Sequence, residues 1–107
     1  MSHVRAIRDK VAQECYDRFN AFHSYAPSDL EEPYVRVAFA LSTNGNPYSP
    51  LSGLAIYDCE VIRYTAKSIT LTPLATVETV GKGRLPKFPY TYIPTKNTSM
   101  KIIGKKA

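Results

Sequence analysis

Residues 34–41, which read Tyr-Val-Arg-Val-Ala-Phe-Ala-Leu, decide the fold. The larger apolar side chains fall on every second residue, which is the period of a β-strand with one buried face. Ala38 and Ala40 leave the second face unusually small. We therefore expect a strand here, with another element packed closely against its alanine face.

Upstream of this strand, residues 3–23 follow a helical period. Apolar side chains recur there at steps of three and four, which places them on one helical face. The opposite face carries charges of opposite sign four residues apart, as in Arg5–Asp9 and Lys10–Glu14. This pattern predicts an amphipathic surface helix at about 3–23, with its apolar stripe on a core.

Downstream, residues 54–64 form a second strand candidate, long enough to need a bulge or a bend. Asn44-Gly45, between the two candidates, is a strong hairpin signal. Residues 100–103 are the last short strand candidate.

Prolines and glycines divide the second half of the chain. Pro73 lacks the N–H that a strand interior donates, so we expect two short strands, 69–71 and 76–80, on either side of it. Residues 81–83, Gly-Lys-Gly, are expected to form a flexible basic turn. Residues 85–94 contain three prolines and are expected to run extended or at a sheet edge.

Together these elements predict one domain spanning residues 1–107, which is long enough to fold without disulfides or metals. The predicted class is α+β, mainly β. The N-terminal helix packs on an antiparallel sheet or partly open barrel of four to six strands, all within 34–103. The predicted core includes Val4, Ile7, Val11, Phe19, Val35, Val37, Phe39, Leu41, Leu54, Ile56, Val61 and Leu71.

Charge is unevenly distributed along the chain. Residues 79–107 hold seven basic and no acidic side chains, whereas residues 1–78 hold seven basic and nine acidic ones. The net charge of +5 is therefore the sum of +7 and −2. A nearly neutral body with a basic C-terminal quarter favours an anionic partner such as nucleic acid.

Cations and aromatic rings alternate within this basic quarter. Cations can contact phosphates and flat rings can stack on bases, and single-strand binding uses both. The candidate nucleic-acid-binding residues are Lys82, Arg84, Lys87, Phe88, Tyr90, Tyr92 and Lys96. The alternative is that the rings pack on the core while the lysines keep the protein soluble.

No motif for catalysis or metal binding stands out. The two histidines and two cysteines lack the C-x-x-C and H-x-x-x-H spacings of metal sites. Cys15, on the apolar helix face, and Cys59, between two acidic residues, are expected to be buried structural thiols. Asp58 is expected to pair with Arg36 or Arg63. We therefore expect no enzymatic activity, no cofactor and no metal.

Two functional hypotheses follow. The first is a non-enzymatic binder of single-stranded nucleic acid or RNA. The alternative is a small structural or accessory subunit of a larger assembly, such as a viral particle, that contacts a protein partner or a second copy. The N-terminus lacks a secretory-signal pattern, and the longest apolar run, 37–41, is far shorter than the ~20 residues that span a bilayer. We expect a cytoplasmic protein without a membrane partner.

Overall fold

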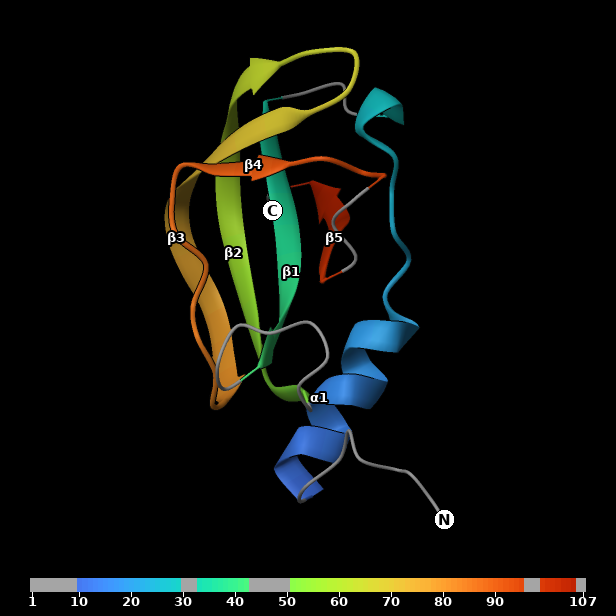
Figure 1. Ribbon diagram of the computed structural model, residues 1–107, viewed down its shortest axis with the longest axis vertical. Coiled ribbons are helices and arrows are strands. Elements are labelled where there is room, and N and C mark those ends of the chain that lie inside the picture. Colours follow the sequence, from blue (N-terminus) through green and yellow to red (C-terminus); the bar gives the residue numbers. More distant parts are fainter. Residues whose placement is uncertain (1–9, 30–32, 43–50, 96–98, 106–107) are drawn as a thin grey trace.

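The computed structural model describes residues 10–29, 33–42, 51–95 and 99–105 (Figure 1). Its elements are α1 (Lys10–Ala21), a short 3-10 helix η1 (Pro27–Asp29), β1 (Tyr34–Ser42), β2 (Leu51–Tyr64), β3 (Ile69–Gly81), β4 (Tyr90–Tyr92) and β5 (Met100–Lys105). The strands form one antiparallel sheet in the order β4-β3-β2-β1-β5, curved into a half-barrel. This confirms the predicted mainly β, α+β fold with an N-terminal helix.

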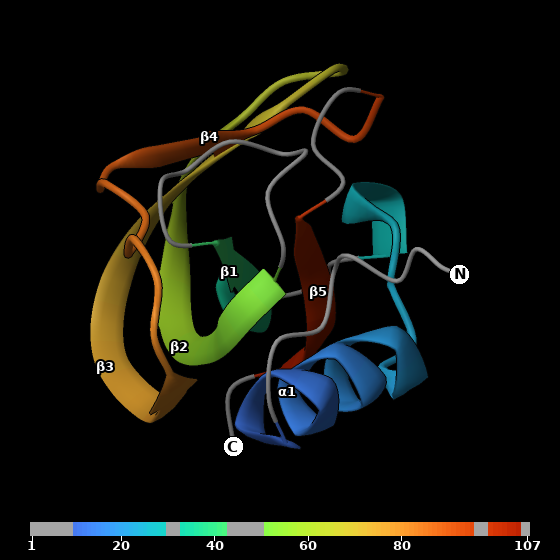
Figure 2. The ribbon, with the colours of Figure 1, turned by 60° about the horizontal axis from the view of Figure 1, so that its bottom comes forward.

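The sheet is apolar on both faces over β1 and β2. Successive residues of β1 alternate between two clusters, so that Phe39 faces the concave core while Ala38 lies beneath α1. The concave core is made of Val35, Val37, Phe39, Leu41, Ala55, Tyr57, Cys59, Ile69, Leu71, Tyr92, Met100 and Ile102. The small alanine face is thus covered by the helix, as the sequence predicted (Figure 2).

The described part of the helix packs through the predicted face at Cys15 and Phe19 but not at Val11. Its buried residues are Ala12, Cys15 and Phe19, whereas Val11, predicted to be in the core, is 44% exposed. The small Ala12 side chain, the next residue along the helix, is buried instead, with a relative exposure of 2%. The prediction for Val11 was therefore wrong. Predicted residues 3–9, including Val4 and Ile7, lie outside the described part of the chain.

The C-terminal end of α1 is anchored by Lys101 of β5. Its Nζ donates to the carbonyl oxygens of Phe19, at 2.8 Å, and Phe22, at 3.1 Å. It also lies 4.8 Å from the centroid of the Phe19 ring. A cation suits the negative end of the helix dipole, so this member of the basic quarter has a structural role.

Most of the remaining core prediction is confirmed. Val61 is only partly buried against the concave core. The predicted residues that are buried are Phe19, Val35, Val37, Phe39, Leu41, Leu54, Ile56 and Leu71.

β3 corrects the prediction of two short strands. It runs without a break through Pro73, which pairs with Cys59 next to a register shift. β4 pairs with β3 only over Ile69–Leu71, so among the described residues no strand flanks β3 beyond that point. A proline is tolerated here because this part of β3 is an irregular sheet edge rather than a sheet interior.

Candidate nucleic-acid interface

The candidate segment, Lys82–Tyr92, leaves the end of β3 and passes in front of it toward β4 (Figure 1). Its start is tied to both neighbouring strands. The Lys82 N–H donates to the Ser52 carbonyl at 2.9 Å, and the Ser52 hydroxyl donates to the Lys82 carbonyl at 2.8 Å. The Arg84 N–H donates to the Ser42 carbonyl at 2.9 Å. The backbone that carries the first two cations is therefore held by β1 and β2.

The glycines at this point serve close packing. A Cβ on Gly83, whose φ is +146°, would lie 2.4 Å from the Cβ of Leu41. A Cβ on Gly53 would lie 2.3 Å from the Lys82 carbonyl oxygen. No ordinary side chain fits such gaps without moving the backbone. The interpretation of residues 81–83 as a flexible turn was wrong, because this stretch packs tightly against β1 and β2.

The three aromatic rings of the segment turn inward. Tyr90 meets Phe39 edge to face, with ring centroids 5.0 Å apart, and Phe88 meets Tyr57 in the same way at 5.3 Å. Tyr92 is buried within the concave core. Burial raises the pKa of both tyrosine hydroxyls. The rings therefore cover the open side of the half-barrel, which is the alternative that the sequence left open, and they do not form a free stacking platform.

The cations of the segment point the other way. Lys82, Arg84 and Lys87 are all exposed, whereas Lys96 lies outside the described residues. The structure thus brings three of the four candidate cations onto one segment and separates them from the rings, which it buries or half-buries.

A different exposed group of cations and a ring was missed by the sequence reasoning. Arg63, Tyr64 and Lys67 lie at the β2–β3 hairpin, and all three side chains are exposed. The hairpin turn is closed by the Thr65 N–H, which donates to the Ser68 carbonyl at 2.8 Å. The residue types were visible in the sequence. The sequence reasoning considered residues 54–64 as a strand candidate, and it looked for cations and rings only in the basic C-terminal quarter.

The two thiols are buried, and most of the described carboxylates accept hydrogen bonds from other groups of the protein. Both cysteines are buried, and neither forms a disulfide. Burial, with a smaller effect of the nearby Asp58 charge, raises the pKa of the Cys59 thiol to about 12, which disfavours the thiolate. Asp58 accepts two hydrogen bonds from Arg36, at 2.8 and 3.1 Å, which confirms one of its two predicted partners.

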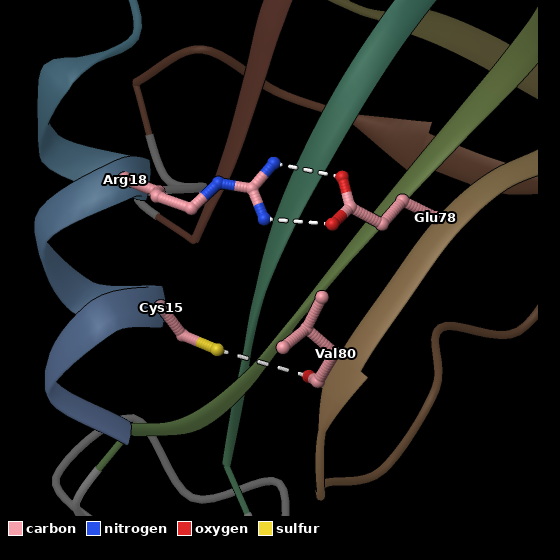
Figure 3. A network of polar contacts seen from close by, with 4 residues as sticks. All are labelled: Cys15, Arg18, Glu78 and Val80. Atoms are coloured by element: carbon pink, nitrogen blue, oxygen red, sulfur yellow. Dashed lines mark hydrogen bonds and ion pairs between the residues drawn. The ribbon is translucent and has the colours of Figure 1, made fainter. Parts of the chain in front are cut away.

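A second polar group ties α1 to the end of β3 (Figure 3). Arg18 donates to both carboxylate oxygens of Glu78, at 2.7 and 2.8 Å, and the Cys15 thiol lies 3.8 Å from the Val80 carbonyl oxygen. The side chains of the arginine and the glutamate are each 40% exposed. Within the described residues, no three His, Cys, Asp or Glu side chains gather as a metal site would require.

Comparison with known proteins adds no relative. No protein-family model, no curated protein and no solved structure matches this chain. None of the helices in the described part is long and apolar enough to cross a bilayer. The functional argument therefore depends on the geometry and charge of the chain's own residues.

Proposed function

We propose that this chain is a non-enzymatic protein that binds single-stranded nucleic acid or RNA through phosphate contacts of Lys82, Arg84 and Lys87. One observation supports the proposal. Three exposed cations lie on one segment whose backbone is anchored to β1 and β2 at its start, in a quarter of the chain that has no acidic residue. Anchoring reduces the freedom that the segment would lose on binding.

The buried rings revise the expected mode of binding. Phe88 and Tyr92 contribute to the concave core, and Tyr90 packs on Phe39, so base stacking by these rings is not part of the proposal. Phosphates are common to every sequence and carry no direct base information. We therefore expect binding that depends strongly on salt and weakly on sequence.

The salt dependence can be stated in advance. Neutralising three phosphates of a single strand gives a slope of about −2 in a plot of log affinity against log salt. Affinity should then fall roughly twentyfold between about 50 and about 200 mM salt. Fluorescence anisotropy with labelled single-stranded RNA and DNA measures this slope, and the absence of binding at the lower salt would refute the proposal.

The decisive variant combines Lys82→Ala, Arg84→Ala and Lys87→Ala. We expect it to bind too weakly to measure at about 200 mM salt and to lose most of the salt slope at about 50 mM. Because all three side chains are exposed, the thermal unfolding midpoint should change little.

A matched control removes the same charge from elsewhere on the surface. Lys10, Arg63 and Lys67 are also exposed, and replacing all three by Ala lowers the net charge by the same amount. If net charge alone attracted the nucleic acid, both triple variants would lose affinity equally. A larger loss in the control would assign binding to the β2–β3 hairpin instead of the proposed segment.

A structural or accessory subunit of a larger assembly, such as a viral particle, is the second candidate. The observation that favours it is the exposure of five consecutive β3 residues, Pro73–Val77. A mainly apolar protein interface depends much less on salt than phosphate contacts do. The cytoplasm or the interior of such a particle is the location proposed for either role.

A further inference from the structure

Tyr64 is the most exposed tyrosine in the described part of the chain, with a relative exposure of 52%. It lies on the hairpin that joins β2 to β3, where Arg63 and Lys67 are also exposed. No acidic residue occurs between positions 61 and 77. An exposed ring in acid-free, cationic surroundings suits an anionic ligand that has flat rings of its own, and single-stranded nucleic acid is such a ligand.

The register of the sheet places this ring on the same face as the candidate segment. Tyr64 pairs with Ile69 of β3, and Ile69 pairs with Tyr92 of β4. Directly paired residues of neighbouring strands point to one face, and both Ile69 and Tyr92 belong to the concave core. Tyr64 therefore projects from the concave side, in front of which the segment runs (Figure 1), while Arg63 points to the opposite side.

The ring is close enough to the cations of the segment to contact the same strand of nucleic acid. Tyr64 and Tyr92 are two strand spacings apart, about 10 Å, and the chain from Lys87 to Tyr92 spans at most about 18 Å. The backbone at Lys87 therefore lies at most about 28 Å from that at Tyr64, which is about eight nucleotides of a stacked strand. A single-strand-binding domain typically occupies about 4–16 nucleotides.

The turn that presents the ring is held by its own hydrogen bonds. The Thr65 N–H donates to the Ser68 carbonyl at 2.8 Å, the Ser68 N–H donates to Thr65 Oγ1 at 3.0 Å, and the two hydroxyl oxygens lie 3.0 Å apart. β4 pairs with β3 directly beside this turn, over Ile69–Leu71. A ring on a fixed backbone loses little freedom when a base stacks on it, so more of the stacking energy contributes to affinity.

We propose that Tyr64 stacks on a base of the single strand whose phosphates contact Lys82, Arg84 and Lys87. The inference rests on the proposed function and adds to it a ring that the segment itself does not supply. Every base has a flat face, so the stacking selects no particular sequence. It does select unpaired strands, because a base in a duplex must first be unstacked and unpaired before the ring can cover it.

Tyr64→Ala separates stacking from charge. In fluorescence anisotropy, the affinity for labelled single-stranded RNA should fall at least about fivefold. The slope of log affinity against log salt should not change, because the substitution removes no cation. Tyr64→Phe keeps the ring face and should bind within about twofold of the unmodified chain. A loss with Tyr64→Phe as large as with Tyr64→Ala would overturn the stacking.

The matched control is Tyr16→Ala. Tyr16 is exposed as well, but it belongs to α1, which covers the opposite face of the sheet. Its replacement should leave the affinity for RNA unchanged. Equal losses with Tyr16→Ala and Tyr64→Ala would also overturn the proposal, and a thermal melt of each variant verifies folding.

Tyr64→Trp reports stacking directly. The chain has no tryptophan, so this substitution introduces one indole, whose fluorescence a stacked base should quench. Single-stranded RNA should quench it, whereas an abasic sugar-phosphate strand of the same length should not, and Tyr16→Trp should respond to neither. Salt-dependent binding without quenching of Tyr64→Trp would overturn the stacking while the phosphate-binding function stands. Absence of binding at about 50 mM salt would overturn both.

Discussion

β1 and β3 flank the same strand, β2, yet they differ sharply in burial. Five of the nine β1 residues are buried, whereas the buried residues of β3 are Ile69 and Leu71, both near its start. β1 has α1 on one face and the inward-turned rings of residues 88–92 on the other. α1 reaches β3 through the Arg18–Glu78 pair and the Cys15–Val80 contact near the end of the strand (Figure 3). Burial in this sheet therefore follows from what covers each strand as much as from the sequence of the strand.

Two arginine–carboxylate pairs also differ in burial. Arg36 of β1 meets Asp58, whose side chain is 10% exposed, while Arg18 of α1 meets Glu78 of β3, where both side chains are 40% exposed. Both pairs are bidentate, so hydrogen-bond geometry does not distinguish them. Only burial does, and it should determine how much each pair contributes to stability.

Shortening one side chain on each strand should test the difference in burial between β1 and β3 most clearly. Phe39→Ala in β1 removes a ring that contacts Tyr57, Phe88 and Tyr90, and we expect a loss of about 3–5 kcal/mol. Val77→Ala in β3 should cost less than about 0.5 kcal/mol, because that side chain is largely exposed. Urea denaturation followed by circular dichroism measures both. Similar losses would show that the exposed part of β3 is more strongly packed than its surface indicates.

β1 and β3 also show which features of the fold could be predicted from the sequence. The alternation of residues 34–41 predicted β1, its buried face and the element over its alanines, because each of these depends on neighbouring residues. The break predicted at Pro73 was wrong because the effect of a proline depends on whether the strand has a neighbour. Whether a second strand lies beside β3 at Pro73 depends on how far β4 extends along β3, and β4 is formed by residues much later in the chain.

The candidate site shows the same limit. Its sequence indicated cations and rings on one segment, and the structure places Lys82 and Arg84 outside and Tyr92 inside. The spacing of these residues could not reveal that the half-barrel has an open concave side. The curvature of β2 and β3 creates a concave apolar surface, and the rings of the segment bury that surface (Figure 2).

Removing the arginine of the buried pair should have an intermediate effect. Arg36→Ala takes from Asp58 its two charge-assisted hydrogen bonds while the carboxylate stays largely buried. We expect a loss of about 1–3 kcal/mol. Adding Asp58→Asn to this variant should restore part of the loss, because the amide has no charge to desolvate. Chemical denaturation of the two variants decides the point, and a neutral Arg36→Ala would place this pair with the exposed one.

Glu78→Gln should have the smallest effect, about 0.5 kcal/mol at neutral pH, because the pair it breaks is exposed and screened by salt. Its pH dependence has a definite sign. The hydrogen bond from Arg18 lowers the pKa of Glu78 in the folded protein, so the pair stabilises the fold fully above the unfolded value of about 4.3. That contribution disappears as the pH falls through the lower, folded value, and the unmodified chain should then approach the variant in stability. Thermal melts between pH 7 and pH 2 follow the difference. A gap between the two proteins that stays constant down to pH 2 would mean that Glu78 stabilises the fold by packing, and that α1 secures β3 by more than charge.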